Sequence, residues 1–218
     1  MRFAAVETST EWCSVALYRD GEIACVERRA ANRHSEMALP MLRMLLKDSG
    51  LQGLDAVAFG AGPGAFTGLR IACGIAQGLA FARGLPVLGV STLEALAEES
   101  GAPRVLACLD ARMREVYYAA LEKRAGRWHE VVPVQCVAPE AVAIPEGEWL
   151  GCGSGFSIYG NLGLKRVLPE VHPSAIAVAR LAAPRLAAGE GVDAALAAPV
   201  YVREKVAFTK AELDERRT

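Results

Sequence analysis

The start of the chain, up to Arg28, contains three short apolar segments separated by turn residues, and this opening constrains the fold more than any other feature. The segments are Arg2–Val6, Cys13–Arg19 and Ile23–Arg28. The dipeptide Asp20-Gly21 between the last two is typical of a β-hairpin turn. The sequence therefore predicts that the chain opens with an antiparallel three-stranded meander.

Helical and extended patterns alternate after this meander. A helix is predicted from Ser35 to Asp48, with Ser35 as its N-cap and Gly50 beyond its end. Ser91 and Glu94 form a capping box that begins a further helix. The elements between these are a strand at Asp55–Phe59, a helix at Leu69–Ala82 and a strand at Pro86–Val90. This order predicts an α/β fold whose mixed sheet is flanked by helices.

The second half gives weaker patterns of the same kind. Ser174 is the predicted N-cap of a last helix, which ends near Gly189. The glycine-rich stretch Gly153–Ser157 is interpreted as a turn. The other predicted elements are strands at Arg104–Asp110, Glu115–Glu122, Trp128–Val137 and Trp149–Gly155, and a short helix at Pro139–Ile144.

Composition limits the classes of function. The 218 residues are 52% hydrophobic, enough for a sizeable core, and the formal net charge is −1. A protein that holds a nucleic-acid backbone unaided usually carries a strong basic excess, so direct, unaided binding is not expected. The six cysteines form no C-x-x-C pair, which indicates reduced thiols in the cytosol. No signal peptide and no membrane-spanning segment are expected.

A glycine loop, Gly60–Gly68, precedes the second predicted helix. Such a loop can direct backbone N–H groups at a phosphate, with Gly62, Gly64 and Thr67 as the candidate residues. It lacks the lysine of a P-loop, and Ala65 stands where the dinucleotide fingerprint needs a glycine. The alternative is a tight turn with Thr67 as the helix N-cap. The spacing alone leaves both interpretations open.

Two predicted helices carry unusual surfaces. The apolar arc of the helix over 35–48 is about twice the ~100° stripe that one core contact needs. The next helix has small residues four apart at Gly74, Gly78 and Ala82, which permit close approach of another helix. These helices either pack on each other and their own sheet or form a partner interface. The candidate interface residues are Met37, Met41, Met44, Leu45, Ile71, Gly74, Ile75, Gly78 and Ala82.

Several motifs, in order along the chain, match one family. The segment Gly62–Ile71 closely resembles the GPGSFTGLRIG signature of the TsaB family, also called YeaZ. Glu7-Thr8-Ser9 stands where that family usually has Asp-Thr-Ser. The other resembling segments are His34-Ser35-Glu36 with Leu39-Pro40, Gly89–Leu96, Asp110-Ala111-Arg112 with Glu115-Val116-Tyr117, and Pro199–Arg203.

This resemblance implies a fold of two actin-like (ribonuclease H-like) lobes. We expect residues 1–103 to form the first lobe, with the docking helices, and residues 104–218 the smaller second lobe. It also implies a non-catalytic subunit that activates a TsaD-type enzyme in threonylcarbamoyladenosine modification of tRNA next to the anticodon. The expected partners are the TsaD-type enzyme and a TsaE-type ATPase, with a homodimer when alone and tRNA only through the complex.

Two enzyme alternatives remain. An ATPase or phosphotransferase of this fold would use Glu7, Thr8, Ser9 and Thr10 with the glycine loop, although Glu7 is one methylene longer than the family's aspartate. The polar turn can instead be capped by its own hydroxyls. A metallopeptidase would need about three metal ligands, and the region that corresponds to the metal-binding histidine pair of TsaD-type proteins offers only His34 and Glu36. We therefore expect no catalytic residue, no metal and no cofactor of its own, with ATP entering only in the complex.

Overall fold

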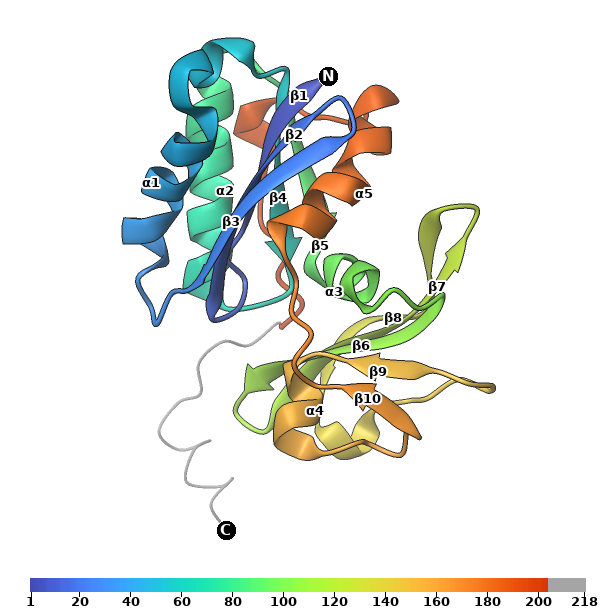
Figure 1. Ribbon diagram of the computed structural model, residues 1–218. Coiled ribbons are helices and arrows are strands. Elements are labelled where there is room, and N and C mark those ends of the chain that lie inside the picture. Colours follow the sequence, from blue (N-terminus) through green and yellow to red (C-terminus); the bar gives the residue numbers. More distant parts are fainter. Residues whose placement is uncertain (204–218) are drawn as a thin grey trace.

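The computed structural model describes residues 1–203, except the side chains of residues 48 and 49, and shows two α/β lobes stacked end to end (Figure 1). Each lobe is built on a five-stranded mixed sheet. The predicted α/β class with two lobes is confirmed.

The first sheet has the strand order β3-β2-β1-β4-β5. Its first three strands pair antiparallel, which confirms the predicted meander, and β4 and β5 continue the sheet in parallel to β1. The strands are β1 Arg2–Glu7, β2 Trp12–Arg19, β3 Glu22–Arg29, β4 Ala56–Gly62 and β5 Val87–Ser91.

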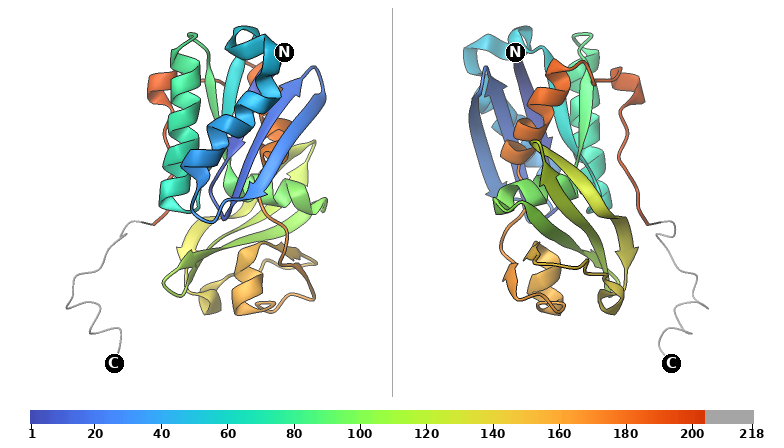
Figure 2. Two further views of the ribbon diagram at one scale, coloured as in Figure 1. Left: turned by 60° about the vertical axis from the view of Figure 1, so that its left-hand side comes forward. Right: turned by 90° about the vertical axis from the view of Figure 1, so that its right-hand side faces the viewer.

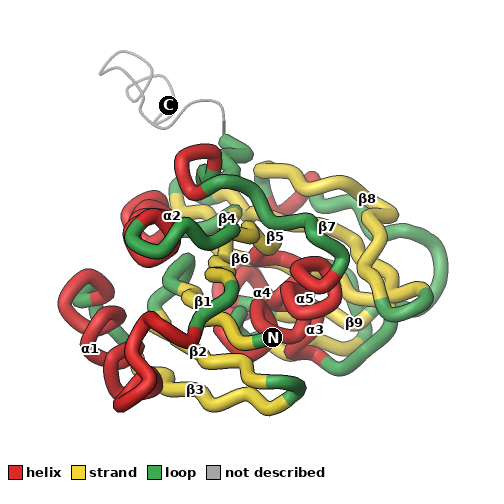
Figure 3. The backbone as a smooth tube through the Cα atoms, turned by 90° about the horizontal axis from the view of Figure 1, so that it is seen from above, coloured by secondary structure: helices red, strands yellow, loops and turns green. Residues whose placement is uncertain are grey.

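Helices cover both faces of the first sheet. Helices α1 (His34–Leu46) and α2 (Phe66–Phe81) lie side by side on one face, and α5 (Ala175–Ala187) lies on the other (Figures 2 and 3). Side chains alternate between these faces. Val6 belongs to the core under α1 and α2, whereas Phe3 and Ala5 belong to the core under α5.

The second sheet has the order β10-β9-β6-β7-β8. Helix α3 (Thr92–Ser100) covers one face and lies between the lobes, and α4 (Ser154–Tyr159) covers the other. The strands are β6 Arg104–Arg112, β7 Glu115–Arg124, β8 Arg127–Val137, β9 Leu150–Cys152 and β10 Arg166–Leu168. The 3₁₀ turns of the described chain are Lys47–Gly53, Pro139–Ala141 and Ala194–Leu196.

Two predicted helix caps are confirmed and two are wrong. Ser91 accepts from the Glu94 amide at 3.4 Å, and Ser174 accepts from two amides of α5. Helix α1 begins after Arg33 without a side-chain cap, so Ser35 lies inside its first turn. Helix α2 begins after Ala65, so Thr67 is inside it as well. Its start is fixed by a tertiary bond instead, because the Ala65 amide donates to the Ser9 carbonyl at 2.7 Å.

The second lobe differs from prediction around Gly153. The predicted strand Trp149–Gly155 is only Leu150–Cys152, and the stretch interpreted as a turn is helix α4. Gly153 has a φ of 111°, which ends the strand, and Phe156 then packs into the core of this lobe. Strand β10, only three residues long, was not predicted.

The expected division at residue 103 separates the two sheets but does not hold for α5. This helix contacts every strand of the first sheet, because its alanine-rich face covers Phe3, Ala5 and Ala58. The chain therefore leaves the first lobe after α3, builds the second sheet, and returns to the first lobe.

Candidate functional site

The glycine loop packs directly on the turn between β1 and β2. A methyl group at Gly64 would lie 2.6 Å from Ser9 Cβ, and one at Gly68 would lie 1.9 Å from the Thr8 carbonyl oxygen. The Thr8 hydroxyl donates to the Gly68 carbonyl at 2.7 Å. These glycines allow the first turn of α2 to lie against the β1–β2 turn without an intervening side chain.

Glu7 lies beneath this contact and is only 1% exposed. Its Oε1 accepts from the Ser9 amide at 2.7 Å, while Oε2 has no hydrogen-bond partner among the described residues. Burial raises the pKa of the Glu7 carboxyl, and the hydrogen bonds from Ser9 only partly oppose this. A methyl at Gly60 would lie 1.8 Å from Glu7 Oε2, so the carboxyl fills the space beside β4.

Most of the predicted phosphate-binding residues lie together in the structure, but protein atoms occupy the space between them. Thr8 and Ser9 are buried with Glu7, and the Thr10 carbonyl accepts from His34 Nε2 at 2.9 Å. A methyl group at Gly62 would lie 2.7 Å from the Val200 carbonyl oxygen, so the backbone at Val200 packs closely on this glycine. Of the candidates in the loop, Thr67 is the exposed one.

Residues 197–203, which we call the strap, connect the two lobes beside this loop. The Val200 amide donates to the Ala61 carbonyl at 2.7 Å, and Gln77 Nε2 donates to the Ala197 carbonyl at 2.9 Å. In the second lobe, Arg203 Nη2 donates to the Ala111 carbonyl at 3.0 Å. The strap therefore links β4 and α2 to the end of β6.

The predicted partner-interface residues divide into a buried and an exposed set. Met41 is 6% exposed and belongs to the core of its own lobe, against which Met37, Leu45 and Ile75 are partly buried. Ile71 is also only half-buried. In contrast, Met44 is 62% exposed.

The small residues of α2 lie on its exposed side. A methyl at Gly74 or Gly78 would meet nothing within 4 Å, and Ala82 is exposed as well. The glycines therefore do not serve packing against α1. Helices α1 and α2 lie next to each other (Figure 2), and we call the exposed interface candidates at these two helices the docking face. It comprises Met44, Gly74, Gly78 and Ala82.

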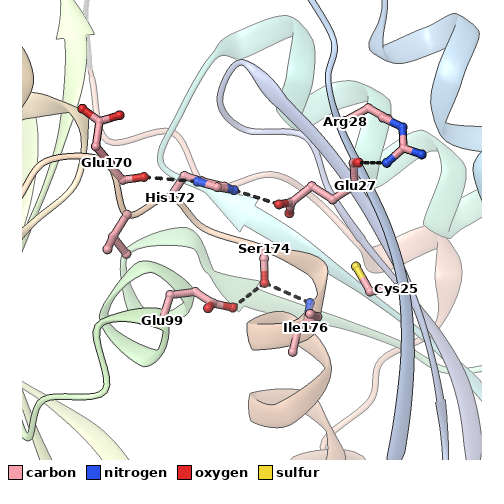
Figure 4. A pocket seen from close by; sticks show the side chains of 9 residues that line it. Cys25, Glu27, Arg28, Glu99, Glu170, His172, Ser174 and Ile176 are labelled. Atoms are coloured by element: carbon pink, nitrogen blue, oxygen red, sulfur yellow. Dashed lines mark hydrogen bonds and ion pairs between the residues drawn. The ribbon is translucent and has the colours of Figure 1, made fainter.

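A hollow of about 580 Å³ lies where the segment entering α5 crosses β3 (Figure 4). His172 Nε2 lies 2.9 Å from Glu27 Oε1, and its Nδ1 lies 3.3 Å from the Glu170 carbonyl. Burial lowers the pKa of His172, but the hydrogen bond and charge of Glu27 outweigh burial and raise it overall. The ring also stacks on Trp12 at 4.2 Å. These contacts hold the segment entering α5 against the first lobe.

Among the described side chains of residues 1–203, which leave out positions 48 and 49, no group of three or more His, Cys, Asp or Glu is arranged to hold a metal ion. In the same part of the chain, no helix is both long enough and apolar enough to cross a membrane.

Comparison with known proteins identifies the family. A protein of Escherichia coli K12 named tRNA threonylcarbamoyladenosine biosynthesis protein TsaB is 39% identical, covering 96% of this chain and 98% of its own length. The chain belongs to the TsaB family. A protein of the same name from Haemophilus influenzae is 35% identical over 94% of this chain and 95% of that protein.

Structural comparison agrees with the TsaB assignment. The solved structure described as YeaZ from Pseudomonas aeruginosa superposes with a TM-score of 0.86 and 41% identity, covering 92% of this chain and 99% of that chain. A family model described as TsaD, tRNA N6-adenosine threonylcarbamoyltransferase, also matches residues 25–156. The expected resemblance to TsaB is confirmed.

The sequence reasoning did not include the strap in the site. The strap carries the Pro199–Arg203 segment that resembles a TsaB motif, so the signal was present, but its spacing gives no indication of what it contacts. The partner of Tyr201 lies in α2 and that of Arg203 at the start of β7, each more than 80 residues away in the chain. Only the folded chain shows this contact.

Proposed function

We propose that this TsaB-family chain is a non-catalytic subunit that binds and activates a TsaD-type enzyme in threonylcarbamoyladenosine modification of tRNA, next to the anticodon. The observation that carries the proposal is the near full-length match to the E. coli protein whose name assigns it to this biosynthesis. The candidate phosphate-binding residues Glu7, Thr8 and Ser9 are buried, and Thr8 lies against Gly68 of α2. The geometry thus favours a structural role for them.

The docking face is where we expect the TsaD-type partner. Glycine within a helix costs about 0.5–1 kcal/mol relative to alanine, and neither Gly74 nor Gly78 has an intramolecular neighbour that requires it. A partner helix that approaches closely would explain both. Met44 supplies an exposed, adaptable apolar side chain on the neighbouring helix α1.

The remaining assignments follow from the same proposal. The isolated chain forms a homodimer through the docking face, and a TsaE-type ATPase joins the complex with the TsaD-type enzyme. The chain needs no cofactor of its own, so ATP is used only within the complex. The tRNA binds the complex rather than the isolated chain, whose net charge of −1 gives little attraction for phosphates.

The test is to mix the purified chain with the TsaD-type enzyme and to measure the mass of the complex by light scattering. Gly78→Leu should abolish the complex while leaving the monomer folded, because the larger side chain blocks helix approach. Arg180→Leu is the matched control, since it places the same side chain on an exposed position of α5, on the opposite face of the first sheet.

If Gly78→Leu binds as well as the unmodified chain, the docking face is misplaced. If the unmodified chain forms no complex under any nucleotide condition but binds ATP tightly with magnesium, the chain is a nucleotide-binding enzyme and the partner proposal fails. A stoichiometric metal retained on purification would instead favour a metallopeptidase.

A further inference from the structure

An exposed cluster of aromatic and arginine side chains lies at the N-terminal end of α2, beside the strap. Phe66 is 45% exposed and Tyr201 49% exposed, although their ring centroids are only 5.4 Å apart. The Arg70 guanidinium lies 4.0 Å from the centroid of the Phe66 ring, and its Nε donates to the Tyr201 hydroxyl at 3.2 Å. Nearly half of the surface of each of these two aromatic residues therefore remains open to solvent while the side chains hold one another in place.

The positive charge continues into the second lobe. Arg203, two residues along the strap from Tyr201, binds the end of β6 and is ion-paired with Glu115. Next to it, Arg112, Met113 and Arg114 all have positive φ values between 55° and 63°. The Arg112 side chain is 86% exposed, whereas its partner Asp110 is only 10% exposed. Arg114 has no ion-pair partner among the described residues. We call Phe66, Arg70, Arg112, Arg114 and Tyr201 the arginine–aromatic surface.

This combination fits one class of partner better than others. Unpaired bases stack on exposed aromatic rings and on guanidinium planes, and arginine binds the adjoining phosphates through its forked N–H groups. A base-paired helix hides the faces of its bases, so duplex RNA would use only the arginines. The chain as a whole is slightly acidic, so this positive charge is local and not part of a general basic surface.

We propose that the arginine–aromatic surface binds unpaired nucleotides of the tRNA that the complex modifies. This inference rests on the proposed function, because that function supplies the RNA. Arg70 and Gly74 are one turn apart on the same exposed side of α2, so the surface adjoins the docking face. The RNA would then cross the boundary between this chain and its partner, which explains how a chain without basic excess contributes to binding.

The test uses the full-length chain in complex with the TsaD-type enzyme and a fluorescein-labelled RNA hairpin with a loop of seven unpaired nucleotides. Fluorescence anisotropy gives the Kd at several salt concentrations. Tyr201→Ala should weaken binding by about 5- to 150-fold, the range measured for loss of one base–aromatic stack. Tyr201→Phe, which keeps the ring, should stay within about twofold of the unmodified complex.

A second variant, Arg70→Gln, tests how much phosphate binding contributes to RNA affinity, separately from base stacking. It should weaken binding and reduce the slope of log Kd against log salt concentration by about 0.7, the value for one phosphate of a single strand. Tyr201→Ala should leave this slope unchanged. Arg180→Gln on α5 is the matched control and should change neither quantity. A blunt RNA duplex of the same length should bind unmodified and Tyr201→Ala complexes equally.

Two results would overturn the inference. Unchanged hairpin affinity in Tyr201→Ala would show that no base stacks there. Loss of the protein complex itself in Tyr201→Ala, seen by light scattering, would show that the surface binds a protein. If even the unmodified chain forms no complex, the proposed function fails separately. In that case the same titration is repeated on the isolated chain at low salt, and the inference stands only if Tyr201→Ala weakens hairpin binding.

Discussion

Replacing Gly68 by alanine should destabilise the chain, whereas the same substitution at Gly78 in the same helix should stabilise it. A methyl at Gly68 would lie 1.9 Å from the Thr8 carbonyl oxygen, which is backbone and cannot rotate away. A methyl at Gly78 would meet nothing within 4 Å. The two substitutions gain a similar helix propensity, so the difference between them reports the contact between α2 and the β1–β2 turn.

The magnitudes follow from these contacts. Overpacking a tight site costs about 1–3 kcal/mol, and Gly68 lies at the severe end because the opposing atom is fixed. Displacing α2 would also weaken the buried hydrogen bond from the Thr8 hydroxyl to the Gly68 carbonyl, which is worth about 1 kcal/mol. We expect a net loss of about 3 kcal/mol for Gly68→Ala and a gain of about 0.5–1 kcal/mol for Gly78→Ala.

Thermal unfolding of the two isolated variants at one fixed, low protein concentration tests this. For a chain of this length, 1 kcal/mol shifts Tm by about 2–4 °C, so Gly68→Ala should melt about 6–12 °C lower and Gly78→Ala about 1–4 °C higher. The concentration is fixed because dimerisation would shift Tm by mass action. If Gly68→Ala has the same Tm as the unmodified chain, α2 does not pack against Thr8 and the account of the glycine loop is wrong.

Two further predictions concern pH. Burial raises the pKa of Glu7 in the folded state, so its charge opposes folding once the pH exceeds the unfolded value of about 4.3. Glu7→Gln should therefore gain stability over the unmodified chain as pH rises from 4 to 8 in urea titrations, by up to about 1.4 kcal/mol per unit of pKa difference. Because the pKa of His172 is raised in the folded state, its pair with Glu27 stabilises the fold fully below pH about 6.5. This stabilisation is lost as the pH rises through the folded-state pKa. His172→Gln should remove this decline, and an unchanged decline would show that the pair does not hold the segment entering α5.

Much of the fold was predictable because local patterns and global structure agree. The meander followed from three apolar segments and one turn dipeptide, and the caps at Ser91 and Ser174 followed from residues that satisfy nearby amides. The wrong caps at Ser35 and Thr67 have a common cause. Both helices begin where tertiary contacts, not a side-chain oxygen, fix the first turn, and such contacts leave no local signal.

The site was less predictable for a similar reason. Spacing showed that Gly62, Gly64 and Thr67 form a loop before a helix, but not whether a ligand or the chain itself fills it. Gly60 and Gly68 were not singled out, yet the closest approaches to Glu7 and Thr8 depend on them. Likewise, helical periodicity grouped Met41 with Met44, although one side chain is buried in the core and the other is exposed.

The return of α5 to the first lobe has a consequence for synthesis on the ribosome. The apolar face formed by Phe3, Ala5 and Ala58 stays uncovered until Ala175–Ala187 has emerged, because this helix is its cover. The lobe that begins first is therefore completed last, after the whole second sheet has been made. An exposed sheet face during that interval is prone to aggregate, so chaperones that bind nascent chains should act on this face before residue 175 is made.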